Sequence, residues 1–454
     1  MTSTPRVLVV GGGLAGLVAA RHLAGGGLDA TLLERRETVG GRVRTLERDG
    51  YRFDRGFQVL FPAYPAVQRE LDLEALDLRR FTSGATIAGP DGRSVLADPR
   101  SAPGTLPATL RNPEITLGDR LRVARLWWEL RRTDPDRLFD ADRGEDQSIE
   151  RHLRDRGFSD GFVERFVAPF YGGITLDRSL STSRRVFEYT FRALAAGGAA
   201  VPASGMEAIP RQLADHVREV GGSVETSREV ESVSSEGDSA TVQLADGMNG
   251  EVDAVVVATD PPTARDLTGL ESIPTDARGC VTQYYALPEG ADLETGKRLL
   301  LNAVDGDDGP NHVVPHSAVA PAYAPDGEAL ISATYLEDGD LELSGDGGNP
   351  GVSSGSGDSR SPEESDEPLA ERTRDALESW YPEQSFDGLE ALHTERVPFA
   401  QFDQPPGVYD RLPETRDPPG SVYLAGDYTR WSSIQGAMRS GREAAKAVLE
   451  DLSG

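Results

Sequence analysis

The sequence of 454 residues has little sulfur and no long apolar run. Its single cysteine, Cys280, cannot form a disulfide within the chain, and without a local motif we assign this thiol no role. No stretch approaches the roughly 18 consecutive apolar residues that a membrane-spanning helix needs. The first residues also lack the pattern of a cleavable signal peptide. These absences predict a reduced, cytoplasmic protein that does not cross a bilayer.

Positive charge is scarce, and lysine is nearly missing. The chain has 75 acidic side chains against 47 basic ones, which gives a formal net charge of −28, and its lysines are Lys297 and Lys446. Nucleic acid is a poor partner for such a chain, because phosphates require a basic protein surface. An acidic, lysine-poor composition is typical of halophilic proteins, in which dense counterions screen the self-repulsion. An acidic face for a basic partner is the alternative.

A glycine motif near the N-terminus carries the clearest chemical signal. Gly11, Gly13 and Gly16 form a G-x-G-x-x-G between an apolar strand and a helix, and Glu34 ends the next strand. The first glycine permits a tight turn, the second lets backbone amides approach a pyrophosphate, and the third lets helix and strand pack closely. Glu34 is expected to bind a ribose diol, which predicts a dinucleotide site. Further residues expected to contact the dinucleotide are Leu14, Ala15 and Arg35.

Two later segments extend this site. Gly41 and Arg42 follow the acidic residue, where a glycine turn and a guanidinium suit a pyrophosphate. Near the C-terminus, Gly426 and Asp427 follow a short strand, and the carboxylate is placed to bind a ribityl or pyrophosphate edge. The next helix is expected to direct the positive end of its dipole at a flavin ring. The residues expected to lie at that helix start are Ile434, Gln435, Gly436 and Ala437.

Together these segments resemble the flavin-containing amine oxidase superfamily, which includes monoamine oxidases, protoporphyrinogen oxidases and carotenoid desaturases. The resemblance covers nearly the whole chain and implies FAD as the cofactor. Residues 53–71, FDRGFQVLFPAYPAVQREL, are similar to plant-type phytoene and zeta-carotene desaturases. They depart from that pattern at Gln58, where those enzymes usually carry histidine. The resemblance implies that Gly56, Phe57 and Gln58 lie near the isoalloxazine and that the backbone of Val230 contacts the adenine.

The pattern and the resemblance predict an α/β fold with two parts. The first is a doubly wound, Rossmann-like FAD-binding domain assembled from residues 1–80, 200–275 and 395–454. The second is an inserted α+β substrate domain, or cap, formed by residues 81–199 and 276–394. Residues 344–367 contain one large apolar side chain, Val352, and we predict a disordered insertion there.

The sequence departs from the amine oxidases proper at several points. Ser433 stands about where those enzymes place a tyrosine of an aromatic cage, no lysine falls where one beside the flavin is expected, and no C-terminal cysteine offers a covalent flavin link. These differences favour dehydrogenation of carbon centres by noncovalent FAD. Hydride transfer to a flavin requires little acid or base from the protein, so we assign no catalytic residue. The predicted walls of the substrate pocket are Tyr171, Tyr284, Tyr285 and Trp431.

The expected activity is that of an FAD-dependent oxidoreductase that desaturates a hydrophobic substrate, as phytoene desaturases do, and passes electrons to oxygen or a quinone. Protoporphyrinogen oxidase or amine oxidase activity is the alternative within this class. A prenyl-binding carrier of the GDP-dissociation-inhibitor type is the alternative outside it. His312, His316 and His393 are candidate acid or base groups, but their spacing does not indicate a metal site.

Residues 117–132, LGDRLRVARLWWELRR, form a predicted helix that combines arginines with two tryptophans. Leu117, Leu121, Ala124 and Trp128 share one face, but other apolar residues lie on the opposite side. This distribution favours a buried cap helix. Docking at a membrane interface, which would make the protein peripheral to the membrane, is the alternative.

Overall fold

A computed structural model describes residues 4–89, 92–97, 115–139, 144–304, 308–336 and 362–453. One of its two large sheets is a parallel sheet of five strands in the order β19-β13-β1-β2-β9. These strands are β1 (Arg6–Val10), β2 (Asp29–Leu33), β9 (Ser223–Glu225), β13 (Ala254–Val257) and β19 (Val422–Leu424). The expected Rossmann-like parallel sheet is therefore present, and it joins segments from both ends of the chain.

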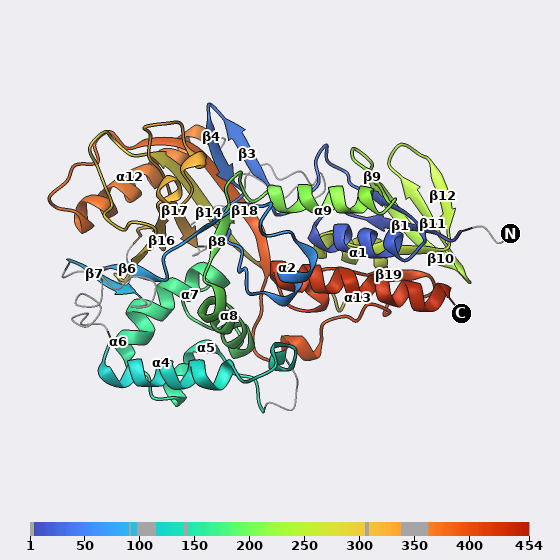
Figure 1. Ribbon diagram of the computed structural model, residues 1–454, viewed down its shortest axis with the longest axis horizontal. Coiled ribbons are helices and arrows are strands. Elements are labelled where there is room, and N and C mark those ends of the chain that lie inside the picture. Colours follow the sequence, from blue (N-terminus) through green and yellow to red (C-terminus); the bar gives the residue numbers. More distant parts are fainter. Residues whose placement is uncertain are drawn as a thin grey trace, which may run out of the picture.

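Both faces of this sheet are covered. Helices α1 (Leu14–Gly25), α9 (Ala208–Glu219) and α13 (Ile434–Leu452) cover one face (Figure 1). The antiparallel strands β10 (Val230–Glu236), β11 (Ser239–Leu244) and β12 (Asn249–Val252) pack against the other face. Helices α1 and α13 touch so closely that a Cβ on Gly441 would lie 2.1 Å from the carbonyl oxygen of Ala15. This contact fixes the helix that follows the C-terminal motif against the helix that follows the N-terminal one.

A second, mostly antiparallel sheet has seven strands in the order β18-β14-β17-β16-β15-β6-β7. Its strands are β6 (Gly84–Gly89), β7 (Gly92–Ala97), β14 (Ala277–Ala286), β15 (Leu299–Asn302), β16 (His312–Val314), β17 (Leu330–Leu336) and β18 (Glu390–Phe402). Helix α12 (Pro362–Trp380) packs on one face through a separate apolar cluster that includes Tyr285 and Tyr381. The expected mixed α+β part is thus present beside the parallel sheet (Figure 1).

A group of helices lies below the second sheet in Figure 1. It consists of α4 (Leu117–Leu130), η2 (Pro135–Phe139), α5 (Ile149–Asp155), α6 (Asp160–Phe162), η4 (Val163–Val167), α7 (Ala168–Thr175) and α8 (Arg184–Gly197). Helix α4 begins with a capping box in which the Thr116 hydroxyl accepts from the Asp119 amide and the Asp119 carboxylate accepts from the Thr116 amide. The helix predicted over residues 117–132 is confirmed by α4.

The remaining elements are short. They are β3 (Thr45–Arg48), β4 (Tyr51–Asp54), α2 (Pro65–Glu70), β5 (Leu78–Arg80), β8 (Ala200–Pro202), α10 (Pro261–Thr268), α11 (His316–Val319), η5 (Pro321–Tyr323), η6 (Val408–Asp410) and η7 (Asp427–Thr429). The buried Asp54 carboxylate accepts from the Thr45 hydroxyl (2.6 Å), the Met206 amide (2.9 Å) and the Tyr323 hydroxyl (2.8 Å). One side chain therefore ties three separated segments together.

The predicted disordered insertion at 344–367 is wrong at its C-terminal end. Its residues up to 361 lie outside those that the structure describes, but residues 362–367 are the first turns of α12. The Asp366 carboxylate there forms an ion pair with Arg396 on β18, which gives a polar segment a fixed partner that its composition does not reveal. Among the described residues, no helix is both long and apolar enough to span a bilayer.

Candidate active site

One large cavity of about 1820 Å³ runs between the two sheets and the helical group. Most residues singled out from the sequence line it, although they come from both ends of the chain. Those lining the cavity are Gly11, Gly13, Leu14, Ala15, Glu34, Arg35, Gly41, Arg42, Gly56, Phe57, Gln58, Val230, Gly426, Asp427, Ile434, Ala437, Tyr171 and Trp431. Those that do not line it are Gly16, Gln435, Gly436, Tyr284 and Tyr285.

The glycine motif forms one end of the cavity. The Gly12 amide donates to Glu34 Oε2 (2.7 Å), and the Arg36 amide donates to Glu34 Oε1 (3.0 Å). Gly16 is required by packing, because a Cβ there would lie 2.0 Å from the carbonyl oxygen of Gly11. A Cβ on Gly13, in contrast, would meet no protein atom within 4 Å. The space beside Gly13 is thus kept for something other than protein, as a pyrophosphate at the start of α1 requires.

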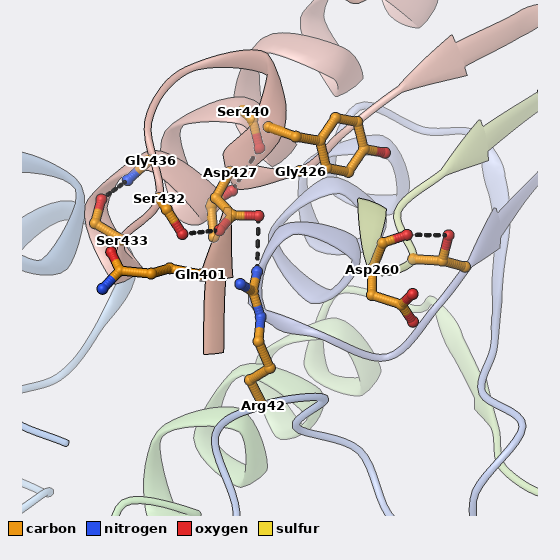
Figure 2. Close-up of polar contacts among 12 residues, drawn as sticks. Arg42, Asp260, Gln401, Gly426, Asp427, Ser432, Ser433, Gly436 and Ser440 are labelled. Atoms are coloured by element: carbon orange, nitrogen blue, oxygen red, sulfur yellow. Dashed lines mark hydrogen bonds and ion pairs between the residues drawn. The ribbon is translucent and has the colours of Figure 1, made fainter. Parts of the chain in front are cut away.

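An ion pair joins the second and third cofactor motifs (Figure 2). Arg42 Nη2 lies 2.7 Å from Asp427 Oδ1, and the Ser432 hydroxyl donates to Asp427 Oδ2 (2.6 Å). Arg42 Nη1 also donates to the carbonyl oxygen of Ala400 on β18 (3.0 Å). Burial lowers the pKa of Arg42, but attraction and hydrogen bonding to Asp427 outweigh it and leave that pKa raised. The guanidinium is therefore a permanent positive charge on the cavity wall.

Of the four residues expected to face the cofactor at the start of α13, two line the cavity and two instead hold neighbouring segments in place. The Ser433 hydroxyl caps the helix by accepting from the Gly436 amide (2.8 Å, Figure 2). Gln435 Oε1 accepts from the Ala66 amide (2.8 Å), so this side chain fixes α2 instead of facing the cavity. A Cβ on Gly436 would lie 2.0 Å from the carbonyl oxygen of Trp431, so close packing explains this glycine. Ile434 and Ala437 are the members of the set that reach the cavity.

The other end of the cavity is largely apolar. Tyr171 lines it. Because its hydroxyl donates to the carbonyl oxygen of Phe187 (3.4 Å), the part of the side chain that faces the cavity is the apolar ring. Trp431 stands where the two ends meet and stacks on Phe139 with ring centroids 5.5 Å apart. Further apolar walls come from helices α4, α7 and α8: Val123, Leu126, Trp127, Pro169, Phe170, Ile174, Val186, Phe187, Phe191 and Leu194. Such a chamber suits an apolar molecule held away from water.

The prediction that Tyr284 and Tyr285 line the pocket is wrong. They are neighbours on β14, so their side chains point to opposite faces of the sheet, and both faces are covered. The Tyr284 hydroxyl donates to the carbonyl oxygen of Asp54 (2.7 Å). Tyr285 packs under α12, where its hydroxyl lies 2.8 Å from that of Thr373. Both rings therefore belong to the core.

Several cavity residues were not anticipated. Arg36 and Arg55 line the cofactor end, and with Arg44 they form a cluster of positive charge. Burial, followed by repulsion from Arg55 and Arg36, lowers the pKa of Arg44 to about 10. An anionic group in the cavity would relieve this repulsion. Asp260 also lines the cavity, three residues after the end of the buried strand β13. The carboxyl end of a parallel strand is where a ligand residue is expected, so this signal was available.

The fold brings two of the three candidate histidines, His312 and His316, to the ring of Phe57 and places the third on β18. His312 lines the cavity beside Phe57 (ring centroids 5.2 Å apart), and burial lowers its pKa to about 4. His316 is packed in the core, where its Nε2 lies 2.8 Å from the Ser332 hydroxyl. His393 lies on β18 beside Glu395. Within the described residues, no group of three or more His, Cys, Asp or Glu side chains is arranged to hold a metal ion.

Comparisons with known proteins agree with this geometry. The family model described as "Flavin containing amine oxidoreductase" matches residues 14–449. A phytoene dehydrogenase of Streptomyces griseus is 30% identical over 292 residues, which are 58% of this chain and 56% of that protein. A carotenoid 3,4-desaturase of Haloarcula japonica is 58% identical over 50 residues, 11% of this chain and 10% of that protein. The chain thus spans about half the length of the first of these relatives and a tenth of the second.

Solved structures share the fold at low sequence identity. A candidate protoporphyrinogen oxidase from Exiguobacterium sp. 255-15 has a TM-score of 0.70 and 20% identity, with 99% of this chain and 100% of that chain covered. Cyclohexylamine oxidase from Brevibacterium oxydans has a TM-score of 0.64 and 15% identity, with both chains fully covered. The expected superfamily and fold are confirmed. The chain belongs to the flavin-containing amine oxidoreductase family and is an oxidoreductase whose cofactor is FAD.

Proposed function

We propose that the protein dehydrogenates a hydrophobic small molecule by hydride transfer to noncovalently bound FAD, in the manner of a phytoene desaturase. The observation that carries this proposal is the continuity of the cavity, which runs from the open space at Gly13 to the apolar chamber around Tyr171. The similarity to a phytoene dehydrogenase over 292 residues supports the same substrate class. Oxygen or a quinone is the proposed final electron acceptor.

The residues of the cofactor end fit FAD in kind and position. Glu34 presents a buried carboxylate for ribose hydroxyls, Gly13 leaves room for the pyrophosphate, and Arg42 supplies a fixed positive charge. Bound FAD would supply the acceptor for two electrons and a proton from a substrate C–H bond. The part of the chain is to place that bond in a dry chamber beside Phe57 and Trp431. The proton that leaves the neighbouring carbon as the double bond forms would pass to the reduced flavin or to water, so the proposal assigns no protein base.

A lipophilic substrate of this kind resides in a membrane, so contact of a cytoplasmic protein with the membrane surface is part of the proposal. Amine oxidation and protoporphyrinogen oxidation draw support from structural neighbours that share the fold alone. A carrier that has lost its flavin would not need the open space at Gly13 or the buried Glu34. These features therefore favour an enzyme over a prenyl-binding carrier.

The test is a visible absorption spectrum of the protein purified in high salt, followed by anaerobic addition of phytoene, protoporphyrinogen or a primary amine. We expect a flavin band that phytoene bleaches and the other two leave unchanged. Bleaching by protoporphyrinogen or the amine alone would replace the proposed reaction with that oxidation. Failure of the protein to take up FAD on reconstitution would contradict the enzyme and favour a carrier.

A further inference from the structure

Helix α4 has an unusual outer face. Among the described residues, the large apolar side chains that are strongly exposed include Leu117 (73%), Leu121 (66%) and Trp128 (50%), all on this helix. With the exposed Ala124, they form what we call the apolar row. At about 100° per residue, the row spans roughly 60° of the helix circumference.

The structure corrects the interpretation of α4 as a helix buried on both sides. Leu126 and Leu130 are buried against the rest of the protein, with exposed fractions of 1% and 2%. The apolar row on the other side has no such cover among the described residues. Other strongly exposed apolar side chains, such as Val220 and Met248, stand singly on other elements. A continuous apolar row on a monomer surface indicates an interaction site.

Arginines border the apolar row on both sides. The same helical spacing places Arg131 on one side and Arg132 on the other, both exposed, and beyond Arg132 lies Arg125, which is paired with Glu129 (2.8 Å). The Arg132 guanidinium lies 3.6 Å from the ring centroid of Trp128, which belongs to the row. The chain as a whole carries a net charge of −28, so a row edged by positive charge is a local exception. Its charge complements an anionic surface.

The apolar row also borders the active-site cavity. Ala124 and Trp128 belong to the row and line the cavity, together with Arg120, Val123 and Trp127 of the same helix. Because Trp128 is half exposed, it stands where the cavity reaches the protein surface. Figure 1 shows α4 along the lower edge of the molecule, away from the parallel sheet at the cofactor end. The row therefore lies at a mouth of the substrate end.

We propose that α4 docks on an anionic lipid bilayer, with the apolar row in the headgroup boundary and the arginines at the lipid phosphates. Leucine and tryptophan on one side of a helix and arginine beside them suit this position, in which the helix lies roughly 5–10 Å deep. A lipophilic substrate then passes from the bilayer into the cavity beside Trp128. This route rests on the proposed function, whereas docking itself rests on the surface alone.

A second copy of the chain fits the row less well. A twofold contact through α4 would bring the arginines of one row against those of the other, and like charges across an interface oppose association. A bilayer with anionic headgroups presents the opposite charge along the whole row. The positive charge around the apolar row therefore favours an anionic lipid surface over a second copy of the chain.

The test compares flotation of the full-length holoprotein with vesicles of phosphatidylcholine, with and without phosphatidylglycerol. The variant Leu117→Glu/Leu121→Glu removes the apolar row without altering a residue that lines the cavity. Val220→Glu/Met248→Glu makes the same charge change at two exposed apolar sites elsewhere. We expect wild type and control to bind the phosphatidylglycerol vesicles, and the α4 variant to bind at least about tenfold less.

Equal binding by the two variants, or no binding by the wild type, would overturn the proposal. Conversion of a wild-type dimer to a monomer in the α4 variant, measured by light scattering, would assign the row to a second copy and overturn it as well. Turnover is measured separately with substrate in detergent and in vesicles. We expect the α4 variant to lose vesicle turnover and keep detergent turnover. If the wild-type protein does not oxidise substrate delivered in detergent, the proposed function is contradicted. The flotation result is independent of turnover and still tests whether α4 docks on the bilayer.

Discussion

The two ends of the cavity are built in different ways. The cofactor end uses backbone amides, an acidic side chain and an ion pair, supplied by short motifs such as residues 11–16 and 40–42. The substrate end uses aromatic and aliphatic side chains from α4, α7 and α8, which meet only after folding. A ligand of fixed shape constrains the backbone at one end, whereas packing alone shapes the other. The following variants test this division.

The largest effect is expected from Gly13→Val. No protein atom lies within 4 Å of a Cβ at this position, so the protein should fold, but the side chain would occupy the space of the pyrophosphate. We expect FAD affinity to fall by at least about 100-fold, with the melting temperature of the apoprotein little changed. Titration of the apoprotein with FAD, followed by flavin fluorescence, measures the affinity.

The matched control for this glycine is Gly25→Val at the far end of the same helix. A Cβ on Gly25 also meets no protein atom within 4 Å, and this residue does not line the cavity. FAD affinity should stay within about twofold of wild type, because no cofactor contact is touched. If Gly13→Val bound FAD as the control does, the dinucleotide would have to lie elsewhere.

A second variant, Asp427→Ala, removes one partner of the ion pair that joins two cofactor motifs. Arg42 would keep its charge in a mostly buried place without its carboxylate, since the two side chains are 29% and 3% exposed. Breaking such a pair should lower the free energy of unfolding by about 3 kcal/mol. Chemical unfolding of the apoprotein in high salt measures this loss.

An exposed ion pair gives the control for Asp427. The Asp246 carboxylate lies 2.7 Å from Arg228, and the side chains are 45% and 29% exposed. Asp246→Ala should cost about 1 kcal/mol, because water screens both charges and the exposed Met248 amide, which Asp246 also accepts from (3.0 Å), can bind water instead. Equal losses of unfolding free energy in the two variants would mean that the buried pair contributes no more than a surface pair. The Arg42–Asp427 ion pair would then not be what holds the two cofactor motifs together.

The same division explains what the sequence could predict. The glycines and Glu34 stand at spacings typical of Rossmann-type dinucleotide sites, and Arg42 follows them in a glycine turn, so they were identifiable without the structure. Tyr284 and Tyr285 were chosen as aromatic candidates, yet the pairing of β14 within its sheet decided that both are core residues. No local pattern reports such pairing.

The sequence pattern also could not show which side chains of α4 are exposed. The sequence of α4 contains apolar residues all round, and only the packing of Leu126 and Leu130 shows which side is free. Arg36 and Asp260 were identifiable from the sequence, because the first lies two residues after Glu34 and the second lies three residues after the end of a buried parallel strand. The fold class and the cofactor end were thus predictable, but the walls of the substrate end depended on tertiary contacts.

The last variant concerns charge at the substrate end. Burial lowers the pKa of His312 to about 4, whereas the unfolded chain protonates a histidine near pH 6.5. Above about pH 6.5 neither state binds this proton, so His312 costs nothing there. As the pH falls toward 4, the unfolded state alone gains the proton, and the folded state loses up to about 1.4 kcal/mol of stability per pH unit.

The variant His312→Gln removes this proton from both states. Between pH 7 and pH 4, its free energy of unfolding should fall less steeply than that of the wild type. The difference in slope should reach about 1.4 kcal/mol per pH unit, the value for one proton, and near pH 7 the two curves should differ by a constant amount. Burial and, to a smaller extent, repulsion from His312 lower the pKa of His316 to about 3, so the variant also removes part of that shift, and this smaller change flattens the curve in the same direction. Parallel curves would mean that the folded protein admits a proton to His312. The substrate end would then tolerate charge, and its difference from the cofactor end would lie in shape alone.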